Sequence, residues 1–394
     1  MDALTTPSNW QRVRLGDMTT SFTKQTGFDY SDFIKPTLIK EYLPNYIPFI
    51  QNKDFLGHYI NYKTDYFIPN EIAIRFPQIL LNEKCLLISI SGAIGNVAVF
   101  NHSQDAFIGG AIAVLKFKEK KSLDFVMHFL MSASGQKLLL NGVKSSSHKN
   151  LTIADLRDLL IPLPSLNEQI AIANILSDVD RYLYSLDALI LKKESVKKAL
   201  SFELLSQRKR LKGFNQNWQR VRLGDILSYE QPTKYLVATT QYLQKGFTPI
   251  LTAGKTFILG YTNDKHGIYT NIPVIIFDDF TTDSKMVNFP FKVKSSAIKI
   301  LSLRDNNQAD LKYIYEKLTL LKHQVTDHKR YWIDEFSNFE IPLPPLNEQI
   351  AIANILSDLD HEIISLKNKK RQFDNIKKAL NHDLMSAKIR VLKE

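Results

Sequence analysis

The chain contains a single cysteine, Cys85, among 394 residues, so it cannot form an internal disulfide. Cys85 begins the apolar run 85–90, which favours a buried, reduced thiol over a nucleophile. The N-terminal residues lack the charged-then-apolar layout of a signal peptide. The longest apolar candidate, 86–100, is interrupted by glycine and asparagine and is shorter than the roughly 18 residues of a membrane span. We therefore expect a folded protein of the cytoplasm.

Motifs that bind cofactors or metals are also missing. The sequence has no glycine-rich turn for S-adenosylmethionine or dinucleotides, no phosphate loop, and no paired-cysteine or HExxH spacing for zinc. Asp105, Glu119 and Lys121 loosely resemble a nuclease site, but Glu119 lies in the lysine-rich run 116–121, which is typical of a solvated strand end. We therefore expect no catalytic residue, no metal and no cofactor bound by this chain.

The segment FDDFTTDSK, 277–285, contains three aspartates that would suit a hard cation. The aspartates lack the regular spacing of a cation loop, and a turn rich in Asp and Thr explains the same residues. We favour the turn.

Positive charge is in moderate excess. Lys and Arg number 51 against 40 Asp and Glu, which leaves a net charge of +11. An excess of this size suits a polyanionic partner such as nucleic acid, although surface lysine also serves solubility. With 44% hydrophobic residues, the chain has enough apolar side chains for two or three folded domains.

Two segments occur twice. IPLPSLNEQIAIANILSD, 161–178, returns as IPLPPLNEQIAIANILSD at 341–358, and WQRVRLGD at 10–17 recurs unchanged at 218–225. Each copy therefore has a marked beginning and a marked end, whereas the interiors between these marks differ. This pattern indicates two different readers held in one repeated framework.

Glycine and proline are absent from 166–212 and from 346–394, which predicts two long helices. Each would be about 60 Å long at about 1.5 Å per residue. Apolar residues alternate in steps of four and three, as in an antiparallel coiled coil. The expected pairing residues, here called the seam, are Ile172, Leu176, Val179, Leu183, Leu186, Ile190, Ile352, Leu356, Leu359, Ile363 and Leu366.

Lysines interrupt the seam at Lys193, Lys197, Lys370 and Lys377. They would either extend along the helix surface with their charge in water or form a basic strip that faces DNA, and we favour the first interpretation.

At the helix starts, either Asn167 and Asn347 cap the first turn or Ser165 and Glu168 form a capping box. The asparagines explain both copies, because Pro345 replaces the serine in the second. We therefore favour the asparagine cap.

Each interior reads as a mixed α and β domain. The first has strand-like runs at 85–90 and 111–117 and a helical segment at 123–140. The second has runs at 249–251, 274–277 and 297–303 and a helical segment at 311–322. We predict an α+β protein with a pseudo-twofold internal repeat, in which two mixed domains are separated by a pair of long antiparallel helices. The predicted boundaries are 1–164, 165–212, 213–344 and 345–394.

Polar, basic loops lie at related places in the two interiors, each just before the shared proline motif. Lys and Arg can neutralise phosphates, while Ser, His, Asn and Arg can contact base edges. SISGAIG, 89–95, and KVKSS, 292–296, offer comparable elements. The candidate DNA-binding residues are Ser91, Gly92, Lys144, Ser145, Ser146, Ser147, His148, Lys149, Asn150, Lys285, Lys292, Lys294, Ser295, Ser296, His328, Lys329, Arg330 and Tyr331.

These features together resemble the specificity subunits of type I restriction-modification systems. The resemblance covers essentially the whole chain. It rests on the duplicated proline-to-EQ motif ahead of long helices, on the twin WQRVRLGD segments, on 277–301, and more loosely on 91–97 and 135–164.

The resemblance implies a non-catalytic subunit whose two target-recognition domains each read half of a bipartite sequence in double-stranded DNA. It also implies two methyltransferase subunits docked on the helices, with restriction subunits joining them. S-adenosylmethionine, ATP and Mg would be bound by those partners. Half-sites one turn apart require readers held about 34 Å from each other, which helices of this length can provide.

Two other classes of function remain open from the residues alone. A self-contained DNA-modifying enzyme would bind S-adenosylmethionine as an isolated chain. A structural coiled-coil adaptor would explain the helices but not the two divergent, basic domains, and it would lack sequence-specific DNA binding.

Overall fold

A computed structural model describes residues 10–141, 150–254, 256–321 and 331–391. The chain forms two compact units: unit 1 is Met1–Leu186 with Lys369–Glu394, and unit 2 is Asp187–Asn368. No helix among the described residues is long and apolar enough to cross a membrane.

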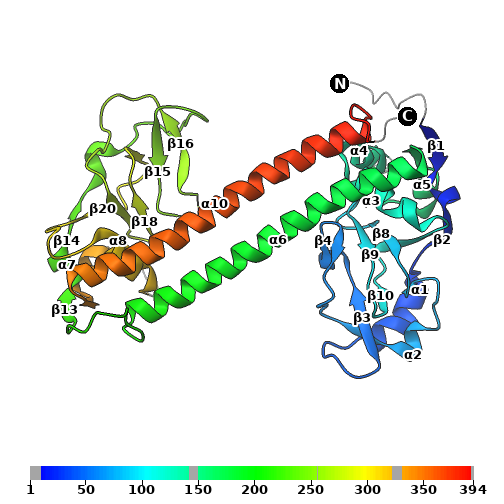
Figure 1. Cartoon of the computed structure of the whole chain (residues 1–394), viewed down its shortest axis with the longest axis horizontal. Helices are drawn as coiled ribbons and strands as arrows, with labels where there is room; N and C mark the ends of the chain where they lie inside the picture. The colour runs from blue at the N-terminus through cyan, green and yellow to red at the C-terminus, as the bar shows by residue number, and fades with distance from the viewer. Residues whose placement is uncertain (1–9, 142–149, 255, 322–330, 392–394) are drawn as a thin grey trace. The chain divides into compact units, whose positions relative to one another are not determined.

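Unit 1 is built on two four-stranded sheets (Figure 1). The strand order of the first is β2 (Thr19–Lys24), β11 (Ile112–Phe117), β8 (Cys85–Ser89) and β9 (Val97–Phe100). The order of the second is β6 (Phe67–Pro69), β3 (Tyr46–Ile50), β10 (Ala106–Ile108) and β7 (Leu80–Leu81). A hairpin joins β4 (Phe55–Leu56) to β5 (Tyr59–Ile60).

Strand β8 explains how the core of unit 1 is divided. Successive side chains of a strand point to opposite faces. Leu86 and Ile88 accordingly join one apolar cluster with the helices, and Cys85 and Leu87 join the other cluster with the second sheet. Burial on both faces accounts for the unbroken apolar run in the sequence. Cys85 is fully buried, as predicted, and burial raises the pKa of its thiol to about 12.

The predicted helix at 123–140 is two helices, α3 (Leu123–Met131) and α4 (Ala133–Asn141). The break lies at Ser132, whose hydroxyl donates to the Phe129 carbonyl at 2.6 Å and accepts from the Gly135 amide at 3.1 Å. A Cβ on Gly135 would lie 2.0 Å from the Phe129 carbonyl oxygen, so this turn requires glycine. The other helices before α6 are short: α1 (Gly27–Asp29), α2 (Asn70–Ala73) and α5 (Ile153–Arg157).

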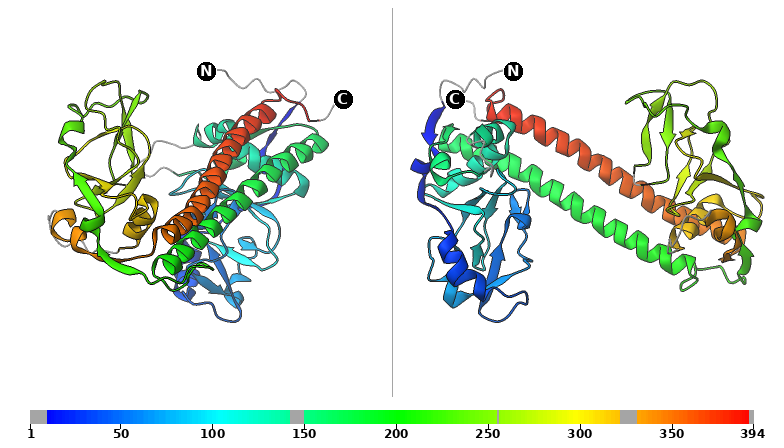
Figure 2. Two further views of the ribbon diagram at one scale, coloured as in Figure 1. Left: turned by 60° about the vertical axis from the view of Figure 1, so that its left-hand side comes forward. Right: turned by 180° about the vertical axis from the view of Figure 1, so that it is seen from behind.

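Unit 2 repeats the plan of unit 1 with fewer residues. The strand order of its first sheet is β14 (Leu227–Glu230), β20 (Ile298–Leu303), β17 (Val274–Asp278) and β18 (Ser284–Val287). The second sheet contains β16 (Ile258–Thr262), β15 (Thr248–Leu251) and β19 (Lys292–Val293). The helices are α7 (Leu223–Ile226), α8 (Leu311–Leu320) and α9 (Tyr331–Asp334). Helix α8 packs against β18 (Figures 1 and 2).

The two repeated sequence motifs are hydrogen-bonded to each other within each unit. In unit 1, β1 (Gln11–Arg14) pairs antiparallel with β12 (Leu160–Leu163). In unit 2, β13 (Gln219–Arg222) pairs in the same register with β21 (Glu340–Leu343). The marked beginning and end of each copy therefore close the domain on itself, immediately before the long helix.

The long helices are α6 (Leu166–Leu205) and α10 (Leu346–Met385). In unit 1, the Tyr182 and Phe373 rings lie 4.6 Å apart, and Glu168 pairs with Arg390. In unit 2, Lys193 pairs with Glu362 and Arg210 with Glu348. The descending partner numbers show antiparallel packing within each unit, and the predicted α+β class with two mixed domains and packed long helices is confirmed.

The helix starts differ from the predicted asparagine cap. In α6 the Ser165 hydroxyl precedes the helix and accepts from the Glu168 amide at 3.4 Å. In α10, Asn347 lies inside the first turn, where its side-chain oxygen accepts from the Glu348 amide at 2.9 Å. The prediction failed because the helices begin at Leu166 and Leu346, which places each asparagine inside the first turn and leaves the cap position to residue 165 or 345.

Candidate nucleic-acid interface

Corresponding turns follow the central buried strand of each unit. The turn between β8 and β9 in unit 1 occupies the same place as the turn between β17 and β18 in unit 2. Each turn has near its start an amide that donates to the residue just before the neighbouring strand of the sheet, β11 or β20. Ile90 donates to the Ala111 carbonyl at 2.9 Å, and Asp279 donates to the Ala297 carbonyl at 3.0 Å. SISGAIG therefore corresponds to the turn that begins at Asp278, and KVKSS corresponds to the segment that precedes β11 rather than to SISGAIG.

In unit 1 the turn contacts the segment that leads to α5. Ser91 forms an antiparallel bridge with Asn150, and the Leu151 amide donates to the Ile90 carbonyl at 3.0 Å. Asn52 donates to the Ser91 carbonyl at 2.6 Å. Gly92 adopts a φ of 74°, which a side chain would strain, so the exposed turn keeps its backbone accessible. The structure thus brings together Ser91, Gly92 and Asn150 from two separate candidate segments.

In unit 2 the aspartates of FDDFTTDSK shape the turn. One carboxylate oxygen of Asp278 accepts from the amides of Phe280 and Thr281 at 2.8 and 3.1 Å. Asp279 is buried against Lys299 with its carboxylate 2.7 Å from the ammonium. In the part of the chain that the structure describes, no three acidic, histidine or cysteine side chains are arranged so that they could hold a metal ion. The turn interpretation is therefore the one the contacts support.

The other candidate chemistry is accounted for by local structure. Glu119 caps a short turn, because its carboxylate accepts from the Lys121 amide at 2.9 Å. A carboxylate used in this way is directed to its own backbone, so the structure gives no support to the nuclease interpretation.

The candidate DNA-binding residues differ in exposure. Gly92, Asn150, Lys294 and Ser296 are exposed, and Ser91, Lys285 and Ser295 are half-buried. Residues 144–149 and 328–330, which include Lys144, Ser145, Ser146, Ser147, His148, Lys149, His328, Lys329 and Arg330, lie outside the described residues.

Two candidates need correction. Lys292 is buried, and its ammonium lies 3.0 Å from Asp264 and donates to the His266 carbonyl, so its charge is directed inward. Tyr331 is fully buried in the core of unit 2. Lys292 lies in β19, where both residues are buried, and the aromatic Tyr331 belongs to the core beside Trp332.

Some seam residues belong to the domain cores, and the others lie along the helices. Ile172 and Leu176 belong to the core of unit 1, and Ile352 and Leu356 to the core of unit 2. The rest are buried or half-buried along the helices: Val179, Leu183, Leu186, Ile190, Leu359, Ile363 and Leu366. The first turns of each helix therefore serve as the wall of a domain core.

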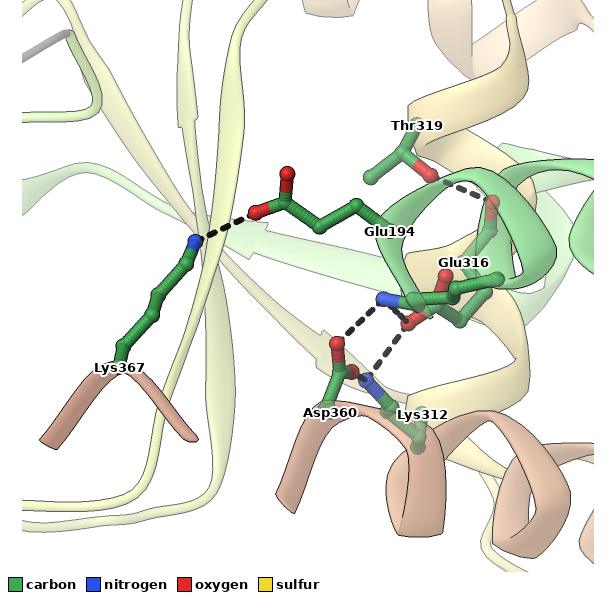
Figure 3. Close-up of polar contacts among 7 residues, drawn as sticks. Glu194, Lys312, Glu316, Thr319, Asp360 and Lys367 are labelled. Carbon is green, nitrogen blue, oxygen red and sulfur yellow. Dashed lines mark hydrogen bonds and ion pairs between the residues drawn. The ribbon is translucent and has the colours of Figure 1, made fainter. Parts of the chain in front are cut away.

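Three of the seam lysines, Lys193, Lys197 and Lys377, form ion pairs rather than extending into water or forming a free basic strip. Lys197 lies 2.6 Å from Asp360 and 3.2 Å from Glu316. Both of these carboxylates also pair with Lys312 (Figure 3). Burial lowers the pKa of Lys312, but the hydrogen bonds to Asp360 and Glu316 and the charges of these carboxylates together raise it by more. The net pKa therefore lies above the ordinary value. Buried charge of both signs thus ties α8 to both long helices in unit 2.

Unit 1 has the same aspartate–lysine pair at the equivalent position, but its neighbours are histidines. Asp180, the counterpart of Asp360, pairs with Lys377, the counterpart of Lys197. His58 and His128 approach its carboxylate at 3.2 and 3.9 Å. Burial lowers the pKa of both histidines, that of His128 to about 3, which favours neutral imidazoles. The lysine–aspartate pair is therefore common to both units, while its surroundings are specific to each.

Comparisons with known proteins agree with this architecture. Residues 7–193 and 215–373 match the type I restriction modification DNA specificity domain. The chain is 48% identical over 166 residues to the EcoR124I/EcoR124II specificity subunit of Escherichia coli, across 41% of this chain and 39% of that protein. It is 24% identical to the MjaVIII specificity subunit of Methanocaldococcus jannaschii, across 99% of this chain and 95% of that protein.

Solved structures share the fold. The S subunit of a type I restriction-modification system from M. genitalium superposes with a TM-score of 0.66 at 19% identity, over 97% of this chain and 98% of that one. A chain from a study of complex assembly in the type I R-M system gives a TM-score of 0.52 at 15% identity, over 96% and 98%. With most of its length matched to the specificity domain, the chain belongs to this family and is a specificity subunit, the non-catalytic component that recognises the DNA target of a type I restriction-modification system.

Proposed function

We propose that unit 1 and unit 2 each read one half of a bipartite site in double-stranded DNA. The observation that carries this proposal is the repeated turn after the central strand, which has the same topology but different residues in the two units. Base edges are read by side chains and amides that a rigid scaffold holds in place. Different turns on one scaffold support two unlike half-sites.

The long-helix segments, 165–212 and 345–394, are proposed to act as spacer and as docking surface. The recognition domains are then 1–164 and 213–344. Large apolar side chains are exposed on both helices, at Tyr184, Leu191, Val196, Ile350, Ile364 and Ile376. A protein partner docked on the helices would remove these side chains from water. The near-identical helix starts support two equivalent methyltransferase subunits as partners, with restriction subunits joining them.

The chemistry of modification and cleavage belongs, in this proposal, to those partners. They would bind S-adenosylmethionine, ATP and Mg, while this chain supplies the DNA target. The complex would act in the cytoplasm.

Mapping methylated positions in DNA from cells that carry the complete system tests the proposal. We expect one bipartite motif whose halves differ in sequence and are separated by a fixed gap. DNA from cells that lack only this chain is the control and should lose the methylation. A continuous motif, or two identical half-sites, would contradict the assignment of one half-site to each unit.

A further inference from the structure

Asp279 and Lys299 form a buried ion pair beneath the turn of unit 2. Their side chains are 4% and 3% exposed, and carboxylate and ammonium lie 2.7 Å apart. Lys299 also donates to the Gln231 side chain at 3.2 Å. The carboxylate has a second function, since its other oxygen accepts from the Trp332 amide at 3.0 Å.

The repeat supplies an apolar comparison for this pair. The register of the central strands places Ile90 of unit 1 where unit 2 has Asp279, and Ala113 where it has Lys299. Ile90 and Ala113 are also buried, and they make no ion pair. The same scaffold position therefore folds with two apolar side chains. Because a buried ion pair is seldom more stable than a well-packed apolar pair, stability alone does not explain the charges.

Asp279 differs from Ile90, its counterpart in unit 1, in how it contacts the chain near the short helix, which is α9 in unit 2 and α5 in unit 1. In unit 1 the segment leading to α5 is held by a backbone bond, from the Leu151 amide to the Ile90 carbonyl. In unit 2 the corresponding segment is bound by a side chain, because the Trp332 amide donates to the Asp279 carboxylate. The same aspartate begins the turn that presents Phe280, which is 53% exposed, and leads to Lys285. Asp279 is thus the point where the exposed turn and the start of α9 are connected.

We infer that Asp279 and Lys299 are a positioning pair for the half-site read by unit 2. Lys299 orients the carboxylate, and the carboxylate sets the place of the turn 280–285 relative to the Trp332 backbone. Neither side chain is exposed enough to contact DNA, so the effect on recognition passes through the turn. This inference rests on the proposed reading of one half-site by each unit.

The decisive variant transfers the residues of unit 1 into unit 2, as the double substitution Asp279→Ile with Lys299→Ala. The assembled methyltransferase complex is assayed on duplexes with single base changes in one half-site or the other. We expect discrimination at the half-site of unit 2 to fall about tenfold or more, because a misplaced turn weakens base contacts. Discrimination at the half-site of unit 1 should not change, which makes it the internal control. The melting temperature should stay within about 5 °C of the parent.

A neutral pair tests the bond rather than the charge. In the double variant Asp279→Asn with Lys299→Gln, the Asn oxygen can still accept from the Trp332 amide, and its amide can donate to the glutamine. We expect this variant to recover most of the discrimination. A neutral pair as defective as the apolar one would overturn the inference.

The remaining outcomes are also decisive. Unchanged discrimination in the apolar variant, or equal loss at both half-sites, would overturn the inference. If this variant unfolds, Asp279→Leu with Lys299→Met gives a closer match of side-chain volume. Unfolding of both would show that the pair maintains the fold and would likewise reject a positioning role. Failure of the parent complex to methylate a bipartite motif would instead reject the proposed function itself.

Discussion

At the scale of single residues, the repeat identifies which contacts belong to the framework. Asp180 with Lys377 and Asp360 with Lys197 occupy the same places in the two copies, as do Glu168 with Arg390 and Glu348 with Arg210. Each pair joins one long helix to the other or to the segment just beyond its end. Removal of one partner leaves a charge that is partly out of water, which costs more than the pair itself stabilises.

The substitution Asp360→Asn tests the cluster in Figure 3. It leaves Lys197 and Lys312 with Glu316 as their shared carboxylate. We expect a loss of about 1–3 kcal/mol, because a partly buried charge loses its partner. Thermal unfolding of the purified complex measures the effect. Asp358→Asn, an exposed aspartate on the same helix, is the matched control and should change stability little. Equal effects of the two variants would contradict the role of the cluster.

The same cluster predicts a dependence on acid. Burial raises the pKa of Asp360, but hydrogen bonds to Lys197 and Lys312 lower it more, and the net pKa lies below the ordinary 3.8. A lowered folded-state pKa means that the carboxylate stabilises the fold above its unfolded pKa and loses this effect as pH falls through the folded one. The difference in melting temperature between the parent and Asp360→Asn should therefore be full near neutral pH and shrink below about pH 4. A difference that grows in acid would contradict the assignment.

At the scale of elements, the absence of glycine and proline was sufficient to predict α6 and α10, because helix interiors exclude these residues. The asparagine cap at the start of each helix was not predicted correctly. Glu168 and Glu348 lie in the first turns of the helices, and each binds an arginine from the segment just beyond the end of the other long helix. Local sequence could not show this, because the partners are brought together only by antiparallel packing.

Each long helix has residues in both units, so a change in helix length tests the proposed spacer role. Seven residues inserted into each helix keep the apolar stripe in phase. The insertion lengthens each by roughly 10 Å, or about three base pairs of DNA. We expect the gap between half-sites to grow while both half-sites keep their sequence, as read by methylation mapping. Insertion into α10 alone should abolish binding, because it shifts the ion pairs of one helix only. An unchanged gap would contradict the spacer role.

At the scale of the whole molecule, two units with one topology carry turns of different chemistry. Replacing residues 18–160 with the corresponding interior of another specificity subunit should change one half-site and leave the other half-site and the gap unaltered. The physical reason is that each unit has its own apolar clusters and its own closing strand pair. Methylation mapping reads the outcome. A change in both half-sites would show that the units do not read DNA independently.

By itself, the sequence determined the duplication, the two long helices, the main strands and the family, because each of these follows from local composition, period or repeated letters. It located the turn of FDDFTTDSK but did not distinguish its aspartates. Only the tertiary structure decided that Asp278 shapes the turn while Asp279 is buried against Lys299. It also decided that Lys292 is buried, and that Lys197 and Lys377 meet aspartates. The reason is that charge pairing depends on which residues far apart in the sequence become neighbours, and burial of a charge is stable only where such a neighbour exists.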